Sequence, residues 1–169
     1  NSVASIESNA FTGCNSLIIY CEAVSKPSGW SSSWNYSNRP VNWGITKDDL
    51  VIELNNLQYL IKNEIAILTG YLGNGNEVAI PSTIEVEGIV YNVTSIGTYA
   101  FYNCSSLISI TIPNSVASIE SNAFSNCSKL TTIIFEESSQ LTSIGSKAFS
   151  ECNSLKTVYY SGSIEDWCN

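Results

Sequence analysis

The stretch Ser95–Ala117 reads SIGTYAFYNCSSLISITIPNSVA, and its pattern recurs along the chain. The frame is Ser-Ile, three variable residues, Ala-Phe, two variable residues, Cys, two more, Leu, two more, and then a β-branched residue or Tyr. The same frame returns at Ser5, Ser118 and Ser143. A unit of this length cannot bury its apolar face alone, so we expect the copies to stack into a solenoid.

One repeat divides into two parts with different periodicity. The apolar residues of 100–107 stand at relative positions 0, 1, 4 and 7, which predicts one or two helical turns with a common buried face. Residues 109–112 alternate polar and apolar side chains, which predicts a short half-buried strand. Pro113 removes a backbone donor and ends the strand. Strands of neighbouring units are expected to pair in parallel, about 4.8 Å apart.

The spacing of the copies stays nearly constant. Phe101, Phe124 and Phe149 recur at intervals of 23 and 25 residues. The two additional residues fall in the acidic stretch 135–140, which we therefore interpret as a loop between stacked units.

These shared positions resemble the BspA-like type of leucine-rich repeat. The residues that carry the resemblance are Ser95-Ile96, Ala100-Phe101, Asn103-Cys104, Leu107, Ile110 and Ile112-Pro113, with their counterparts in the other copies. The resemblance implies a mostly-β solenoid with short helical turns on its convex side and parallel strands on its concave side. It also implies a surface or secreted protein, from bacteria or protists, that acts in adhesion and binds host or matrix proteins.

The chain divides into five predicted segments. They are a leucine-rich repeat (1–22), a Trp-rich cap or connector (23–44), an antiparallel β entry segment (45–93), three leucine-rich repeats (94–160) and a degenerate terminal segment (161–169). Residues 1–11 repeat residues 114–124 letter for letter. We therefore expect a fragment of a longer array, with an export signal upstream.

The entry segment is predicted to insert antiparallel β-hairpins into the solenoid. Alternating or β-branched runs predict strands at 50–54, 57–61, 65–71 and 89–93. Asn63-Glu64 and Glu87-Gly88 stand between such runs as turns. Ile80-Pro81 repeats the end of a solenoid strand, so the strand before it is expected in the solenoid sheet.

Composition excludes several classes of function. The formal charge is −8 and there is no basic stripe, which argues against nucleic acid and anionic membrane surfaces as partners. No apolar run approaches a membrane span, so no membrane insertion is expected in this segment. Charged residues are only 13%, and the polar surface of Ser, Thr and Asn suits an extracellular or cell-surface solenoid.

The sequence predicts no catalytic, cofactor-binding or metal-binding residue. The absence of His removes the commonest general base and most zinc sites. Acidic pairs such as Glu136-Glu137 are interpreted as solvated loop residues, with a calcium site there as the lesser alternative. We therefore expect a protein that is not an enzyme and has no cofactor.

Four of the six cysteines share one repeat position. Cys14, Cys104, Cys127 and Cys152 are predicted to form a ladder of buried free thiols. Cys21 and Cys168 lie outside the ladder, where a disulfide or a reactive thiol is the alternative.

An aromatic cluster interrupts the repeats. Trp30, Trp34, Tyr36 and Trp43 lie in a segment rich in Ser and Pro. One interpretation is a cap over the open end of a repeat stack, because buried aromatic rings supply a large apolar area. The alternative is a platform on which sugar rings stack. The segment also resembles the ending found between blocks of BspA-like repeats.

Three functions remain open, and the first is binding of a host or matrix protein, or a glycan, on the concave face. The outward strand residues there are predicted to be Ile19, Ser109, Thr111, Thr132, Ile134, Thr157 and Tyr159. The second is a structural spacer that presents other domains. The third is a carbohydrate-binding module built on the Trp-rich segment. The oligomeric state is not predicted.

Overall fold

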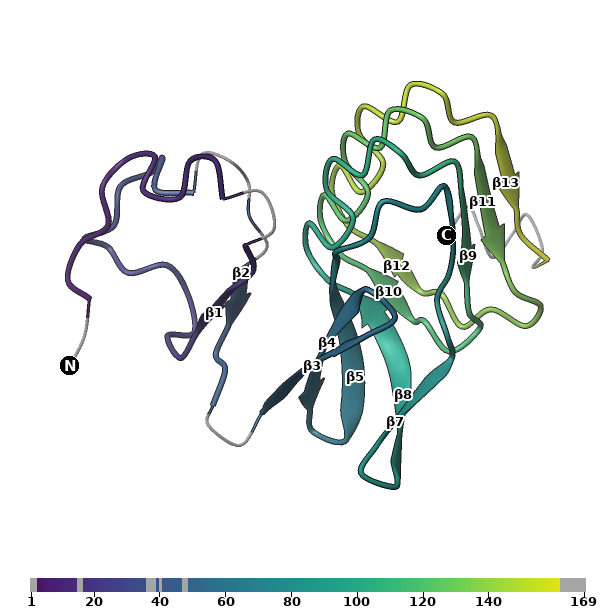
Figure 1. The fold of residues 1–169 in the computed structure, drawn as a ribbon, viewed down its shortest axis with the longest axis horizontal. Helices are drawn as coiled ribbons and strands as arrows, with labels where there is room; N and C mark the ends of the chain where they lie inside the picture. Colours follow the sequence, from purple (N-terminus) through teal and green to yellow (C-terminus); the bar gives the residue numbers. More distant parts are fainter. Residues whose placement is uncertain (1–2, 15–16, 36–38, 40, 47–48, 162–169) are drawn as a thin grey trace. The chain divides into compact units, whose positions relative to one another are not determined.

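The structure, a computed structural model, describes residues 3–14, 17–35, 39, 41–46 and 49–161. It separates into two compact units, unit 1 (Asn1–Asp49) and unit 2 (Leu50–Asn169). The elements, shown in Figure 1, are β1 (Ile19–Cys21), β2 (Val41–Trp43), β3 (Leu50–Leu54), β4 (Leu57–Lys62), β5 (Ile65–Tyr71), β6 (Glu77–Ala79), β7 (Thr83–Val86), β8 (Ile89–Ile96), β9 (Ser109–Ile112), β10 (Ser118–Ile119), β11 (Thr132–Phe135), β12 (Ser143–Ile144) and β13 (Thr157–Tyr159).

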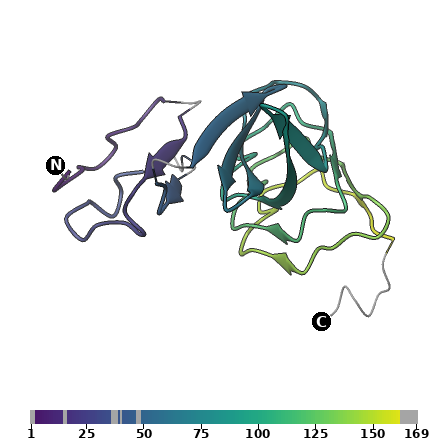
Figure 2. The same cartoon turned by 90° about the horizontal axis from the view of Figure 1, so that it is seen from below.

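Unit 2 is a β-solenoid whose coils place strands in two sheets. Among the described residues, the four-stranded sheet has the order β13-β11-β9-β6, and its strands all pair in parallel. The second sheet has the order β12-β10-β8-β5-β4-β3, with β7 paired to β8. The two sheets lie on different sides of the coils (Figures 1 and 2). The predicted parallel solenoid is therefore confirmed.

The Ser-Ile dipeptides form a strand ladder that the sequence did not predict. In parallel register, Ser118 pairs with Ser95 on one side and with Ser143 on the other. The two-residue strands β10 and β12 are too short to show a period in the sequence. Each repeat consequently contributes two strands to the solenoid, one to each sheet.

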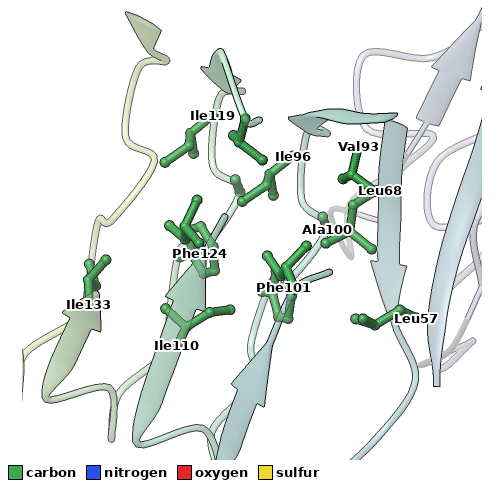
Figure 3. Close-up of a cluster of buried hydrophobic side chains, with 14 of the residues drawn as sticks. Leu57, Leu68, Val93, Ile96, Ala100, Phe101, Ile110, Ile119, Phe124 and Ile133 are labelled. Carbon is green, nitrogen blue, oxygen red and sulfur yellow. The ribbon is translucent and has the colours of Figure 1, made fainter. Parts of the chain in front are cut away.

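A stack of aromatic rings forms the centre of unit 2. Phe124 stacks on Phe101 with ring centroids 4.9 Å apart, and on Phe149 at 5.1 Å, with interplanar angles of 13° and 7°. Tyr71 of β5 extends the stack beyond Phe101 at 5.4 Å. Figure 3 shows the two central phenyl rings among the isoleucines of the two sheets. The constant spacing of the repeats keeps these rings in register.

The predicted helical turns are wrong, because no helix occurs in the described residues. The residue before Ala-Phe and the residue before Cys both adopt positive φ, at Tyr99 (60°) and Asn103 (60°) in the first full coil. Left-handed residues four apart interrupt a right-handed helix. The backbone N–H of Phe101 instead donates to the carbonyl of Ala123 in the next coil, at 2.7 Å. The apolar spacing therefore comes from successive tight turns.

The predicted hairpins of the entry segment are present. β3 and β4 pair antiparallel, as do β4 and β5, and β7 and β8. Asn63 and Glu64 both have positive φ, 50° and 64°, as a two-residue hairpin turn requires. β5 then pairs in parallel with β8, which joins the hairpins to the solenoid sheet. β6 lies in the four-stranded sheet beside β9, as the Ile80-Pro81 pattern predicted.

Unit 1 contains the first repeat and a second coil made by the Trp-rich segment. β1 pairs in parallel with β2, with Ile19 opposite Val41. Ser31 donates its N–H to the carbonyl of Ile6 at 2.9 Å, in the way that Glu120 donates to Ile96 in unit 2. The segment interpreted as a cap or connector therefore adopts the backbone pairing of a repeat without the repeat sequence.

Candidate binding surface

The outward face of the four-stranded sheet carries two rows of side chains. Strand registration places side chains of equal parity side by side across β6, β9, β11 and β13. The first row is Glu77, Ser109, Thr132 and Thr157. The second row is Ala79, Thr111, Ile134 and Tyr159. The structure thus brings the six predicted strand residues of unit 2 together on one face.

Burial separates this outward face from the core. Ile110 and Ile112 of β9 are fully buried, whereas Ser109 and Thr111 between them are half-buried. β11 shows the same alternation. At the end of the sheet, Tyr159 is 60% exposed and is the aromatic residue of the two rows. The surface combines hydroxyl groups with apolar side chains, which suits a partner that offers both polar and apolar contacts.

The sequence pattern did not reveal two members of the rows. Glu77 and Ala79 belong to β6 and are both exposed. The sequence Val78-Ala79-Ile80-Pro81 contained the signal, because it ends as the repeat strands end. Ile19 was predicted for the same face but lies in unit 1, on β1, where it is half-buried opposite Val41.

The tryptophans of unit 1 pack against one another. Trp34 is buried, and its ring lies 4.8 Å from that of Trp30 and 6.1 Å from that of Trp43, measured between centroids. Phe11 meets Trp34 edge to face at 5.9 Å. Trp30 also donates its indole N–H to the carbonyl of Val3 at 3.2 Å. These contacts make the indole rings part of the packing of unit 1. Tyr36 lies outside the described residues.

The thiols form only part of the predicted ladder. Cys127 and Cys152 are buried, and their Sγ atoms donate to the carbonyls of Phe101 and Phe124 at 3.0 and 3.1 Å. Cys104 is half-buried, and Cys14 is exposed, so its predicted burial is wrong. Its position at the repeat motif of unit 1 gives it less cover than its counterparts in unit 2 have.

Hydrogen bonding and burial raise the pKa of the two buried thiols, Cys127 and Cys152. The neighbouring Cys104 side chain and burial together raise the pKa of Cys127 to about 12. A hydrogen bond with Cys127 and burial raise the pKa of Cys152. Cys21 is free and half-buried, and burial raises its pKa as well. Cys168 lies outside the described residues. Since thiolate is the reactive form, Cys127 and Cys152 have the environment of structural thiols.

A pocket lies beside β6 in unit 2. It has a volume of about 360 Å³ and is lined by the β3–β4 turn, by β6 and by two tyrosines: Leu54, Asn55, Asn56, Leu57, Tyr59, Tyr71, Glu77, Val78, Ala79 and Pro81. Tyr59 is fully buried, and its hydroxyl group has no hydrogen-bond partner among the described residues. Burial raises the pKa of Tyr59 to about 12, so the hydroxyl stays neutral. The repeat pattern of the sequence does not predict this pocket.

The described part of the chain gives no support for a metal site or for a membrane-spanning helix. Within it, no group of three His, Cys, Asp or Glu side chains is placed to hold a metal ion, so the calcium alternative at Glu136-Glu137 gains nothing. That part also contains no helix with the length and apolar character that a membrane crossing needs.

Comparison with known proteins identifies one family and several solved structures. The model of the BspA type leucine rich repeat region (6 copies) matches residues 79–168, more than half of the chain. Among curated proteins, none matches the chain.

The solved structures are bacterial leucine-rich repeat proteins. A leucine rich cell surface protein from Faecalibacterium prausnitzii is 30% identical with a TM-score of 0.60, over 64% of this chain and 30% of that one. The T. pallidum leucine rich repeat protein is 33% identical with a TM-score of 0.55, over 64% and 49%. One from Bacteroides capillosus shares the fold, at 24% identity and a TM-score of 0.50, over 66% and 99%. The chain thus spans less than a third of the first and about half of the second.

Proposed function

The chain belongs to the BspA-type leucine-rich repeat family, and from this premise we propose that it is a cell-surface or secreted binding protein. Its partner is a host or matrix protein, held on the outward face of the four-stranded sheet. The observation that carries the proposal is the pair of rows that begins at Glu77 and Ala79 and ends at Thr157 and Tyr159. The surface location draws on the F. prausnitzii relative, which is named a cell surface protein.

The chemistry of the rows supports a protein partner. Interfaces are enriched in tyrosine, and few residues supply most of the binding energy. Tyr159 at the exposed end of the second row is the strongest candidate anchor, with Ile134 beside it as an apolar neighbour. The hydroxyl groups of the first row supply hydrogen-bond donors and acceptors around this anchor. None of these side chains needs a cofactor or a reacting group, which fits a binding role rather than catalysis.

A charge placed on the face tests the proposal. The full chain is applied to an array of immobilised extracellular-matrix proteins and glycans, beside the variants Thr111→Arg and Tyr159→Ala. Ser128→Arg is the matched control, because Ser128 is exposed and lies on a turn away from the sheet. We expect both face variants to lose binding at least tenfold, which is about 1.4 kcal/mol, while the control keeps it.

Two results would count against the proposal. Equal binding by the face variants and the control would move the partner to another surface. Absence of binding to every matrix protein and glycan would favour the structural spacer instead.

A further inference from the structure

β6 leaves one edge of the four-stranded sheet open. Ser109 of β9 donates to the carbonyl of Asn76 at 3.0 Å, and Ile80 donates to Thr111 at 3.0 Å. Residues of even number in this stretch therefore turn their backbone polar groups toward β9. Glu77 and Ala79 turn theirs away, and in the described part of the chain no strand other than β9 pairs with β6. An open edge with free N–H and C=O groups is a template for another strand.

The pocket of about 360 Å³ lies along this open edge. Glu77, Val78 and Ala79 line one side of it, and Asn55 and Asn56 of the β3–β4 turn line another. Leu54, Leu57 and Pro81 supply apolar walls. A strand added to β6 would place every second side chain on the same side, so one side chain can enter the pocket while the backbone pairs.

The pocket has one charged residue in its lining, the exposed Glu77. Neither lysine nor arginine lines the pocket, and the structure shows no cation paired with the Glu77 carboxylate among the described residues. The whole chain carries a formal charge of −8, which attracts cationic partners. A side chain that is positively charged and rich in donors complements this site.

We propose that the free edge of β6 binds an extended segment of a partner polypeptide as an added strand, with one Lys or Arg side chain of that segment in the pocket beside Glu77. Backbone pairing supplies the affinity, and the pocket selects the basic residue. This site uses the edge of the sheet rather than its outward face, so it goes beyond the function proposed above.

A random peptide library tests the inference, because it samples many candidate segments at once. Phage that display random linear nine-residue peptides are selected on the immobilised full chain, with the variant Ala79→Pro as counter-selection. Proline at residue 79 removes an N–H that points away from β9, so the pairing with β9 remains. We expect enriched peptides to contain a Lys or Arg flanked by β-branched residues, and to lose binding on the variant.

Substitutions in the pocket separate recognition from folding. Glu77→Gln should weaken the selected peptides about fivefold, and should leave their Lys→norleucine analogues unaffected. Tyr59→Phe should raise the melting temperature of the free chain, because it removes the unpartnered hydroxyl, and should leave the peptides bound, because that hydroxyl has no exposed surface. Thr111→Arg, on the outward face, should leave the peptides bound.

Several results would overturn the inference. One is enrichment that is equal on the wild-type chain and on Ala79→Pro, provided that circular dichroism shows the variant folded. If it does not fold, the selected peptides are resynthesised with N-methyl groups at alternate positions, and undiminished binding of both methylated series contradicts strand addition. Failure to enrich any peptide would also overturn it, and so would loss of binding on Thr111→Arg alone. A last contrary result is a neutral glycan that displaces the peptides, with the displacement followed by the amide NMR signals of Asn55 and Glu77.

Discussion

Phe124 in unit 2 lies between two parallel phenyl rings, whereas Phe11, at the same motif position in unit 1, meets the edge of Trp34. Phe124 is fully buried, and Phe11 is only half-buried. Trp34 is the one buried side chain among the described residues of unit 1. The two regions share a frame and a pattern of backbone pairing, but they differ in how much apolar surface their coils cover.

The difference shows what a repeat needs from its neighbours. A coil buries its apolar side chains only when a coil of matching shape lies on each side. In unit 1 the second coil has no Ala-Phe pair, and indole rings of larger area fill the space against the first repeat. The end of unit 2 shows the same dependence, since Val158 stands at a core position of β13 and is 42% exposed.

The largest expected effect tests the ring stack directly. Phe124→Ala removes a ring that contacts two others, and we expect it to lower the free energy of unfolding of unit 2 by about 4 kcal/mol. Phe11→Ala should cost unit 1 only about 1–2 kcal/mol, because that ring is half-buried and has one aromatic partner. Urea unfolding followed by circular dichroism and by tryptophan fluorescence measures both. Equal losses would remove stacking as the difference between the units.

Alkaline pH should affect unit 2 next most strongly. The pKa of Tyr59 is about 12 in the folded chain, above its ordinary value near 10, so the folded state holds the proton more tightly. The contribution of the neutral Tyr59 hydroxyl to the stability of the folded chain is therefore fully present below about pH 10 and is lost as the pH rises toward 12. We expect the stability advantage of Tyr59→Phe over the wild-type chain to grow by about 2 kcal/mol across this range.

Urea unfolding at pH 8, 10 and 11.5 measures this advantage. Tyr102→Phe is the control, because that ring is half-buried on a turn rather than in the core. An advantage that stays constant with pH would mean that the Tyr59 hydroxyl ionises as freely in the folded chain as in the unfolded one.

The comparison also shows which features a sequence reveals. Four copies of one frame predicted the solenoid, and period-two alternation matches the alternating burial of β9 and β11. The helical turns were predicted from spacing and from the family resemblance, and neither reports the positive φ of Tyr99 and Asn103 that breaks the helix. The second coil of unit 1 escaped notice because its backbone repeats while its letters do not.

The candidate sites divide in the same way. The rows on the four-stranded sheet follow from local periodicity, so the sequence placed six of their eight members. The pocket beside β6 depends on how the β3–β4 turn, more than twenty residues away, approaches that strand. No periodic signal encodes such an approach, and the partnerless Tyr59 hydroxyl is visible only once side chains are placed.

The cysteine position gives a smaller contrast between the units. Cys127→Ala should cost about 2 kcal/mol, because it opens a cavity and leaves the Phe101 carbonyl without its Sγ donor. Cys14→Ala should be neutral, since Cys14 is exposed. Urea unfolding measures both variants, and labelling by a thiol reagent should proceed much faster at Cys14 than at Cys127. Rapid labelling of Cys127 in the folded chain would contradict its protected position.

The smallest effect concerns the turn that both units share. Lys147 adopts φ of 57°, at the position that Asn9 (62°) and Asn122 (57°) hold in other coils. Asparagine tolerates this left-handed conformation better than lysine does, so Lys147→Asn should stabilise unit 2 by about 0.5–1 kcal/mol. Asn9→Lys should destabilise unit 1 by a similar amount. Lys129→Asn is the control, because Lys129 is exposed and lies outside the positive-φ positions.

Thermal unfolding of the three variants gives the sign of each change. Matched gains and losses would show that the turn chemistry is the same in both units. The contrast between Phe124 and Phe11 would then come from the stacking of coils and not from the turns that connect their strands. A neutral Asn9→Lys beside a stabilising Lys147→Asn would instead place part of the difference in the turns, because the same backbone conformation would then matter only where neighbouring coils hold it.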